Sequence, residues 1–411
     1  MIWFLLIILL SMVKSRTKFT FFSPIVVFYS FFLLSLLLSI PYHHFMPEDW
    51  KFNIAQLDRI NDTAFSTAIE TFIKMLIYFS IGVVFYKYAF RVSKNKDFKF
   101  DLTIKLPSIS VQVLELLSIV IIAIDLILLW TLYGNEFFIR NSYTMEANKL
   151  GVMTLEYSLL SLMFLAGVLY KNRILSSFAI SVFVTLLCIG FGSRMATIYF
   201  MVYCFVVYVL YFKPSERQIF WVFISPFIVI FMGYNIALRL SDSHGLLPYL
   251  LLPINDPGAI VENTFFNIYY TLVFGIFATY KTLIENPVEY SYLYTSLNPS
   301  PGFMTDWYII YKELRINPYA PFTAIGEIFT YPNIAFFFYF FVGIFFSYCE
   351  GVILRLLSNN KIISGFILFI ITVAFIPYSF EYNLRSSVRF IYYSTFVIII
   401  IKTFKIPKLK L

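Results

Sequence analysis

Long apolar runs alternate with short polar segments along the whole chain. Most runs hold about 16–25 residues, and a helix needs about 20 mainly apolar residues to cross about 30 Å of hydrocarbon. We therefore predict an all-α polytopic integral membrane protein with about 11 transmembrane helices. The runs are residues 1–13, 19–40, 66–90, 109–133, 153–170, 174–189, 195–212, 219–238, 333–354, 362–380 and 390–401.

The composition agrees with this pattern. Of the 411 residues, 60% are hydrophobic, 21% are aromatic and only 13% are charged. A soluble domain has about 25% charged and about 45–50% apolar residues. The composition therefore excludes a soluble enzyme, a nucleic-acid-binding domain and a disordered chain.

The polar connections form two alternating sets that differ in charge. The short basic set holds 18 of the 31 lysines and arginines, and the longer set of mixed sign holds 11. Because cytoplasmic connections carry the excess of Lys and Arg, we predict that the basic set and the C-terminus are cytoplasmic. The basic set comprises residues 14–18, 91–105, 171–173, 213–217, 355–361 and 402–410. The predicted external set comprises residues 41–65, 134–152, 192–194, 239–332 and 381–389.

One apolar segment, residues 263–284, does not fit this alternation as a simple span. A single crossing there would place the Lys-rich C-terminal tail on the external side. We therefore expect a re-entrant or interfacial helix. Residues 239–332 then form one large external loop that carries short or re-entrant helices, within a single membrane domain of residues 1–411.

The sequence contains no motif for a metal or a disulfide framework. The three cysteines, Cys188, Cys204 and Cys349, lie far apart in apolar runs, and no Cys-x-x-Cys or Cys/His cluster is present. We expect no cofactor and no bound metal.

Arginine outnumbers lysine among the predicted external residues, whereas lysine dominates the cytoplasmic set. Arginine is preferred where a phosphate or carboxylate is held by a planar fork of donors. The external arginines therefore indicate an outward-facing site for an anion. The alternative is that they are interfacial anchors whose side chains extend to lipid headgroups. The candidates for binding a diphosphate are Arg140, Arg194, Arg239, Arg315, Arg385 and Arg389.

Two of these arginines lie in distinctive segments. Arg194 ends the turn Gly192-Ser193-Arg194 between two apolar runs, where a tight hairpin keeps its guanidinium near the membrane surface. Arg315 precedes a segment with Pro318 and Pro321, which favour an extended backbone.

A general base near these arginines would be Glu327 or His244. We favour Glu327 at the outer end of a span, where desolvation would raise its pKa and the arginines would oppose that rise. His244 lies in a Gly- and Ser-flanked loop without evident anchoring neighbours.

Charged residues inside the apolar runs indicate either a proton pathway or interhelical pairs such as Asp125 with Lys74. These charges are Lys74, Lys87, Glu115, Asp125, Glu156 and Glu350.

These features resemble the bacterial O-antigen and capsule repeat-unit polymerases of the Wzy type. The whole chain matches that family as a pattern of many spans, sparse charge and one large late external loop. The local resemblance lies in Gly192-Ser193-Arg194, in the two Arg–Gly pairs Arg140/Gly151 and Arg315/Gly326, and in the segment 318–327.

The resemblance implies an enzyme of the bacterial inner membrane with its active site on the periplasmic face. It would transfer a glycan from undecaprenyl diphosphate to a lipid-linked repeat unit, without a nucleotide sugar or a metal. Arginines would bind the leaving diphosphate. Expected partners are undecaprenyl-diphosphate-linked oligosaccharides, membrane lipids, a chain-length regulator and a flippase, and no nucleic acid. The alternatives are the related O-antigen ligase and a flippase or transporter of lipid-linked oligosaccharides.

Overall fold

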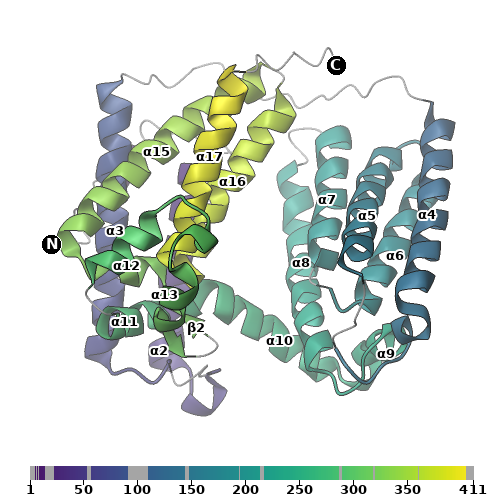
Figure 1. Cartoon of the computed structure of the whole chain (residues 1–411), viewed down its shortest axis with the longest axis horizontal. Helices are drawn as coiled ribbons and strands as arrows, with labels where there is room; N and C mark the ends of the chain where they lie inside the picture. Colours follow the sequence, from purple (N-terminus) through teal and green to yellow (C-terminus); the bar gives the residue numbers. More distant parts are fainter. Residues whose placement is uncertain are drawn as a thin grey trace. The chain divides into compact units, whose positions relative to one another are not determined.

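The structure is a computed structural model that describes residues 5, 7, 9–13, 23–52, 57–90, 110–143, 148–193, 195–212, 217–286, 289–317, 320–359 and 361–403. The described chain is almost entirely helical (Figure 1). Its one described sheet consists of two very short antiparallel strands, β1 (Arg315–Asn317) and β2 (Ala320–Pro321). The predicted all-α fold is confirmed.

The long helices coincide with the apolar runs, and their ends differ from the predicted ends by six residues or fewer. Of the run 1–13, residues 5, 7 and 9–13 are described, and all of these are helical. The helices that match the other runs are α2 (Pro24–Phe45), α3 (Asp62–Ala89), α4 (Val111–Tyr133), α5 (Lys149–Leu169), α6 (Ile174–Gly190), α7 (Met195–Tyr211), α8 (Arg217–Leu240), α15 (Pro332–Ser358), α16 (Ile362–Glu381) and α17 (Leu384–Thr403).

Nine helices in the described part of the chain are long and apolar enough to cross a membrane, which identifies a multi-pass membrane protein. α6 and α7, at 17 residues each, are slightly shorter than these nine. The nine include residues Pro257–Glu285, built from α10 (Pro257–Tyr269), a π turn η4 (Tyr270–Phe274) and α11 (Gly275–Glu285). Its length and composition therefore allow a crossing, and the re-entrant path stays a prediction.

The chain divides into two compact units. Unit 1 comprises residues up to Phe100 together with Tyr269–Lys410, and unit 2 comprises Asp101–Ile268. The predicted external loop 239–332 contributes to both units. Its helix α9 (Leu246–Asn255) belongs to unit 2. Its helices α12 (Tyr290–Leu297), α13 (Trp307–Glu313) and α14 (Ala324–Phe329) belong to unit 1.

Unit 1 is built on a very close crossing of α3 and α15. A Cβ atom on Gly82 would lie 2.0 Å from the Phe340 carbonyl oxygen, and one on Gly343 would lie 2.2 Å from the Phe79 carbonyl oxygen. Glycine at both positions lets the two backbones touch, as small residues do between membrane helices. Beside the crossing, Phe28 of α2 stacks on Phe79 with ring centroids 3.8 Å apart.

A buried ion pair also joins α3 to α15. Lys87 Nζ lies 2.6 Å from Glu350 Oε2, and both side chains are almost completely buried. Ser23, which caps α2, donates its hydroxyl to the other carboxylate oxygen. An isolated charge inside a membrane protein is costly, so these partners account for two of the charges that interrupt the apolar runs.

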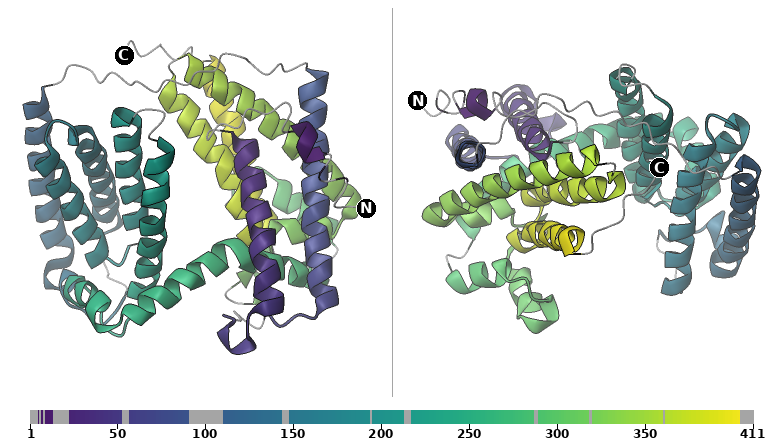
Figure 2. Two further views of the ribbon diagram at one scale, coloured as in Figure 1. Left: turned by 180° about the vertical axis from the view of Figure 1, so that it is seen from behind. Right: turned by 90° about the horizontal axis from the view of Figure 1, so that it is seen from above.

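Unit 2 contains the helices α4 to α8, which lie side by side (Figures 1 and 2). α5 packs against α4, α6 and α7. Buried Asp125 accepts a hydrogen bond from Ser158 of α5, and Lys74 of unit 1 pairs with Glu70 one turn earlier at 2.8 Å. Asp125 and Lys74 thus each have a partner within their own unit, and the suggested pair between them stays a prediction.

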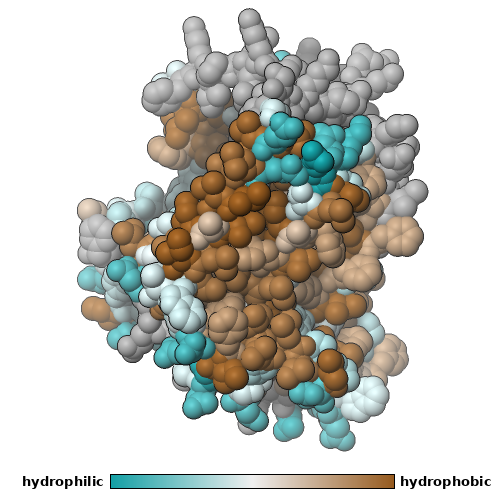
Figure 3. All heavy atoms as spheres, turned by 90° about the vertical axis from the view of Figure 1, so that its right-hand side faces the viewer, coloured by the Kyte–Doolittle hydropathy of each residue, from teal (hydrophilic) through white to brown (hydrophobic). Residues whose placement is uncertain are grey.

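One face of unit 2 is suited to lipid. α4 leaves Leu116, Ile119 and Ile127 more than 60% exposed, although its sequence is strongly apolar. Figure 3 shows a broad hydrophobic area on this side, with hydrophilic residues gathered toward its upper and lower margins. An exposed apolar surface of this kind is stable only in contact with hydrocarbon or another apolar surface.

Candidate functional site

A cavity of about 320 Å³ lies at one end of unit 2. Its residues come from all five helices, at the ends of α4, α6 and α8 and in the first half of α5 and α7, and from the connections that follow α4 and α6. The connections at this end belong to the predicted external set, whereas Lys171 and Arg173 lie at the opposite end of α5 and α6. The cavity is lined by Tyr133, Tyr143, Val152, Leu155, Glu156, Leu159, Cys188, Phe191, Ser193, Tyr199 and Arg239.

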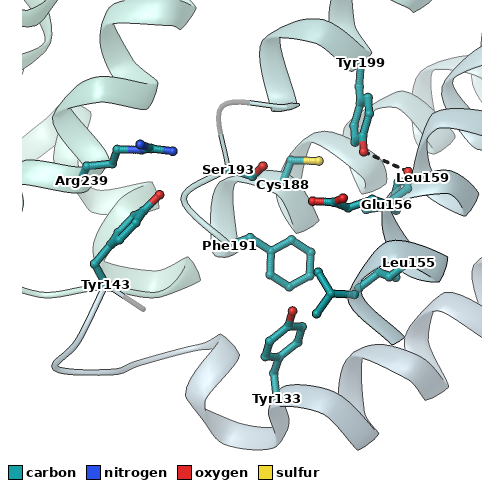
Figure 4. Close-up of a pocket in the computed structure, with 11 residues that line it drawn as sticks. Tyr133, Tyr143, Leu155, Glu156, Leu159, Cys188, Phe191, Ser193, Tyr199 and Arg239 are labelled. Carbon is teal, nitrogen blue, oxygen red and sulfur yellow. Dashed lines mark hydrogen bonds between the residues drawn. The ribbon is translucent and has the colours of Figure 1, made fainter. Parts of the chain in front are cut away.

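Two opposite charges face each other across this cavity. Figure 4 shows the Arg239 guanidinium and the Glu156 carboxylate pointing toward one another from opposite sides, with Ser193 between them in this view. Arg239 also lies over the Tyr143 ring, 5.2 Å from its centroid. The Glu156 carboxylate makes no hydrogen bond or ion pair with any described residue. A polar ligand between the two groups could therefore accept hydrogen bonds from the Arg239 guanidinium and donate one to the Glu156 carboxylate.

Tyrosines and apolar side chains form the rest of the wall. Tyr199 donates its hydroxyl to the Glu156 carbonyl oxygen at 2.9 Å, and Tyr143 donates to the Gly192 carbonyl oxygen at 3.0 Å. Leu155, Leu159 and Phe191 supply apolar surface. An apolar wall with a few convergent polar groups is the usual form of a small-molecule site.

The turn after α6 requires its glycines. Gly192 has a φ of +64°, which favours glycine, and a Cβ there would meet the Tyr143 ring at 3.0 Å. A Cβ on Gly190 would lie 2.3 Å from the Phe137 ring. The Gly192-Ser193 part of the sequence motif is thus a tightly packed edge of the cavity. Arg194 lies outside the described residues.

Arg140 and His244 support this turn from the other side. They form an isolated antiparallel bridge, and Arg140 Nη1 donates to the Gly190 carbonyl oxygen at 2.9 Å. Arg140 Nε donates to the Ser142 carbonyl oxygen at 3.0 Å, while Nη2 is buried and has no partner among the described residues. Two of the three guanidinium nitrogens of Arg140 therefore donate hydrogen bonds to backbone carbonyl oxygens.

His244 is anchored, contrary to the sequence expectation. It is only 7% exposed, and its Nδ1 lies 2.9 Å from the Tyr249 hydroxyl. The ring also bonds the Leu238 backbone. Burial, and then the charge of Arg140, lower the pKa of His244 below its usual range, so the ring is neutral near pH 7. The expectation failed because only the folded structure shows that Tyr249, Leu238 and the bridge partner Arg140 contact this residue.

Glu327 lies in unit 1, on the short helix α14, and is buried. Burial raises its pKa to about 8, and one hydrogen bond from the Leu384 amide, at 3.3 Å, partly opposes that rise. The predicted rise in the pKa of Glu327 is present. Arginines were predicted to oppose this rise, but they are not among the groups that shift the pKa. The carboxyl group therefore holds a proton at neutral pH.

The remaining arginines also belong to unit 1. Arg385 is 2% exposed, donates to the carbonyl oxygens of Thr295 and Ser300, and lies 5.0 Å from the Trp307 ring centroid. Arg389, one turn further along α17, is half-buried and makes no hydrogen bond or ion pair to the described residues. Arg315 on β1 is exposed and lies over the Tyr311 ring.

The sequence candidates thus form two groups. Unit 2 brings together Arg140, Arg239 and His244 around the Gly192-Ser193 turn, and unit 1 holds the other described candidates, Glu327, Arg315, Arg385 and Arg389. Sequence reasoning noticed Glu156 as a charge inside an apolar run but assigned it no role in the site. Only the packing of α5 shows which face of the helix meets the cavity.

Comparison of the chain with protein-family models, with curated proteins and with solved structures finds no match.

Proposed function

We propose that this protein is a membrane glycosyltransferase that joins oligosaccharide repeat units carried on undecaprenyl diphosphate into a surface polysaccharide, such as an O-antigen or a capsule. The observation that carries the proposal is the cavity of unit 2, where Arg239 and Glu156 face each other beside the Gly192-Ser193 turn. The resemblance to Wzy-type polymerases concerns that same turn.

The reaction needs a fixed positive charge and a proton acceptor. The acceptor hydroxyl oxygen bonds to the anomeric carbon of the donor, and the bond from that carbon to the diphosphate oxygen breaks. The electron pair leaves with the lipid diphosphate, and the hydroxyl proton passes to a base. A guanidinium such as that of Arg239 stabilises the developing negative charge through paired N–H donors.

Three groups compete for the role of base. Glu156 lies in the cavity with Arg239 and has no competing partner among the described residues, so its position supports it best. Glu327 holds its proton at neutral pH, which suits an acid better than a base. The ring of His244 is engaged by Tyr249 and Leu238, which favours a positioning role and weakens the case for the O-antigen ligase.

The proposed location is the bacterial inner membrane, with the cavity at the periplasmic face. The cavity lies at the end of unit 2 opposite Lys171 and Arg173, and cytoplasmic connections are the basic ones. A flippase would deliver the lipid-linked repeat units to that face, and a chain-length regulator would be a second partner.

The proposal is tested with membranes that contain the protein and purified lipid-linked repeat units, scored for a ladder of chain lengths. Arg239→Lys keeps the positive charge but loses the paired N–H donors of the guanidinium, so the rate of chain extension should fall severely. Glu156→Gln should abolish chain extension at an unchanged protein level. Arg173→Lys, the same change at the opposite end of unit 2, is the matched control. Failure of the wild-type protein to form any ladder, or full activity of both variants, contradicts the proposal. Transfer of finished glycan to a lipopolysaccharide core would instead indicate the ligase.

A further inference from the structure

Three side chains with metal-binding chemistry converge in unit 1, where α2 ends and α3 begins. His43 and His44 lie in the last turn of α2, and Asp62 is the first residue of α3. One ligand atom from each of the three lies within 4.8 Å of the other two. The sequence shows no metal motif here because the acidic residue lies 18 positions after the histidine pair.

The spacing of these atoms fits a small metal ion. Asp62 Oδ1 lies 3.0 Å from His43 Nε2 and 3.7 Å from His44 Nδ1. Bond lengths of about 2.0–2.1 Å in tetrahedral geometry place neighbouring ligand atoms roughly 3.3–3.4 Å apart. The two observed distances lie on either side of that value. The longer one exceeds the range of a good hydrogen bond.

The convergence of two adjacent histidines is itself unusual. Successive residues on a helix point about 100° apart and do not normally share a partner. Here the ring centroids of His43 and His44 lie 4.8 Å apart, and both rings approach one carboxylate oxygen. His43 is held in place by stacking on Phe65, with centroids 4.1 Å apart and planes 15° apart.

The ligand atoms have few partners apart from one another. His43 Nε2 lies within hydrogen-bond distance of Asp62 Oδ1, at 3.0 Å, so a bound ion would take the place of the proton between these two atoms, whereas the buried His43 Nδ1 has no partner among the described residues. The nearby ammonium of Lys51 is occupied by Glu48 Oε1 at 2.6 Å and by the His43 carbonyl oxygen at 3.2 Å. The Asp62 side chain is 83% exposed and that of His44 is 43% exposed, which leaves room for water to complete the coordination.

We infer that His43, His44 and Asp62 form a binding site for a divalent transition-metal ion of the zinc type, which joins the end of α2 to the beginning of α3. Two imidazole nitrogens and one carboxylate oxygen suit Zn²⁺ and its spectroscopic substitute Co²⁺ better than Mg²⁺ or Ca²⁺, which prefer oxygen ligands alone. This inference does not depend on the proposed glycosyl transfer.

The experiment uses the full chain, purified in detergent without a histidine tag and stripped of metal with a chelator. Zn²⁺ is titrated calorimetrically, and Co²⁺ is followed by its visible absorption. We expect one ion per chain. Asp62→Asn and His44→Asn, both at exposed positions, should weaken binding at least about tenfold, the loss that even outer-shell changes can cause. Asp49→Asn, the same change at an exposed carboxylate of the same connection, should bind as the wild type does.

A second measurement separates metal binding from misfolding of the variants. Zn²⁺ should raise the unfolding temperature of the wild type and of Asp49→Asn, EDTA should reverse the rise, and Asp62→Asn should show no rise. The inference is wrong if the wild type binds no Zn²⁺ at micromolar concentrations. It is equally wrong if Asp62→Asn binds Zn²⁺ as tightly as the wild type does, because the ion then lies elsewhere.

Discussion

Arg140 and His244 exchange both of their backbone hydrogen bonds, with nitrogen–oxygen distances of 2.9 and 3.0 Å, although they lie 104 positions apart. This bridge joins the connection after α4 to the connection after α8 at the cavity end of unit 2. The Arg140 side chain continues from the bridge to the Gly190 carbonyl oxygen. The polar connections at this end therefore form an ordered support for the Gly192-Ser193 turn.

Arg140→Lys should destabilise the protein. A lysine ammonium cannot donate to Ser142 and Gly190 with the geometry of a guanidinium, and each buried hydrogen bond that is lost costs about 1–3 kcal/mol when a carbonyl group stays unpaired. We expect a lower unfolding temperature in detergent. Arg315→Lys, the same change at an exposed position, should stay within about 0.5 kcal/mol of the wild type. Equal unfolding temperatures for Arg140→Lys and the wild type would show that the guanidinium bonds are dispensable.

Gly343→Ala should prevent normal packing of α3 against α15. The added Cβ would lie 2.2 Å from the Phe79 carbonyl oxygen, and neither backbone can yield without separating the helices. We expect a severe loss of folded, monodisperse protein in size-exclusion chromatography. Gly351→Ala on the same helix meets no atom within 4 Å, so it should be neutral or stabilise the helix by up to about 1 kcal/mol. Similar behaviour of the two variants would contradict the close crossing.

The pair Lys87–Glu350 should show strong coupling. Removing one partner leaves a buried charge uncompensated, so Lys87→Met or Glu350→Leu alone should cost about 3–5 kcal/mol. The double variant Lys87→Met/Glu350→Leu should recover most of that loss, because two apolar side chains need no partner. A double-mutant cycle of unfolding free energies measures the coupling. Additive effects would mean that the two groups do not interact.

Glu327 should make stability depend on pH. Its pKa is about 8 in the folded protein and about 4.5 in the unfolded chain, so the folded state binds the proton more tightly between these values. The contribution of Glu327 to the free energy of unfolding should therefore be fully present below about pH 4.5 and be lost as the pH rises to about 8. Each unit of pKa shift corresponds to about 1.4 kcal/mol.

Glu327→Gln removes this titration and keeps the shape of the side chain. Its unfolding temperature should be close to that of the wild type near pH 5 and clearly higher near pH 9. Thermal unfolding in detergent at several pH values measures the difference. A difference that does not change with pH would mean that the carboxyl group titrates normally and that α14 is more open than the structure shows.

Much of the fold can be predicted from local chemistry. In hydrocarbon, a run of about 20 apolar residues must form a helix, because only a helix pairs all of its own backbone N–H and C=O groups. The ends of α4, α6 and α7 therefore lie within two residues of the ends of the apolar runs. The tight turn at Gly192-Ser193 is equally local, since two glycines break adjacent runs. Neither conclusion needs to know which helix lies beside which.

The pairing of charges depends on packing. Asp125 and Lys74 looked like plausible partners because both interrupt apolar runs, yet Asp125 bonds Ser158 and Lys74 bonds Glu70. Glu350 meets Lys87 only because Gly82 and Gly343 let α3 and α15 approach so closely. A sequence specifies the charge of a side chain, but the rotation of its helix against a neighbour selects the partner.

For the candidate sites too, local sequence patterns identify some features, and the packing of the helices decides the others. Composition and charge pattern were enough to identify a multi-pass membrane protein and to select arginines at one end of the helices. The facing of Glu156 and Arg239, the anchoring of His244 by Arg140, and the meeting of His43 and His44 with Asp62 each join residues from different helices or connections. Such contacts depend on how helices rotate and cross, which is set by the sum of many apolar contacts and appears in no local pattern of residues.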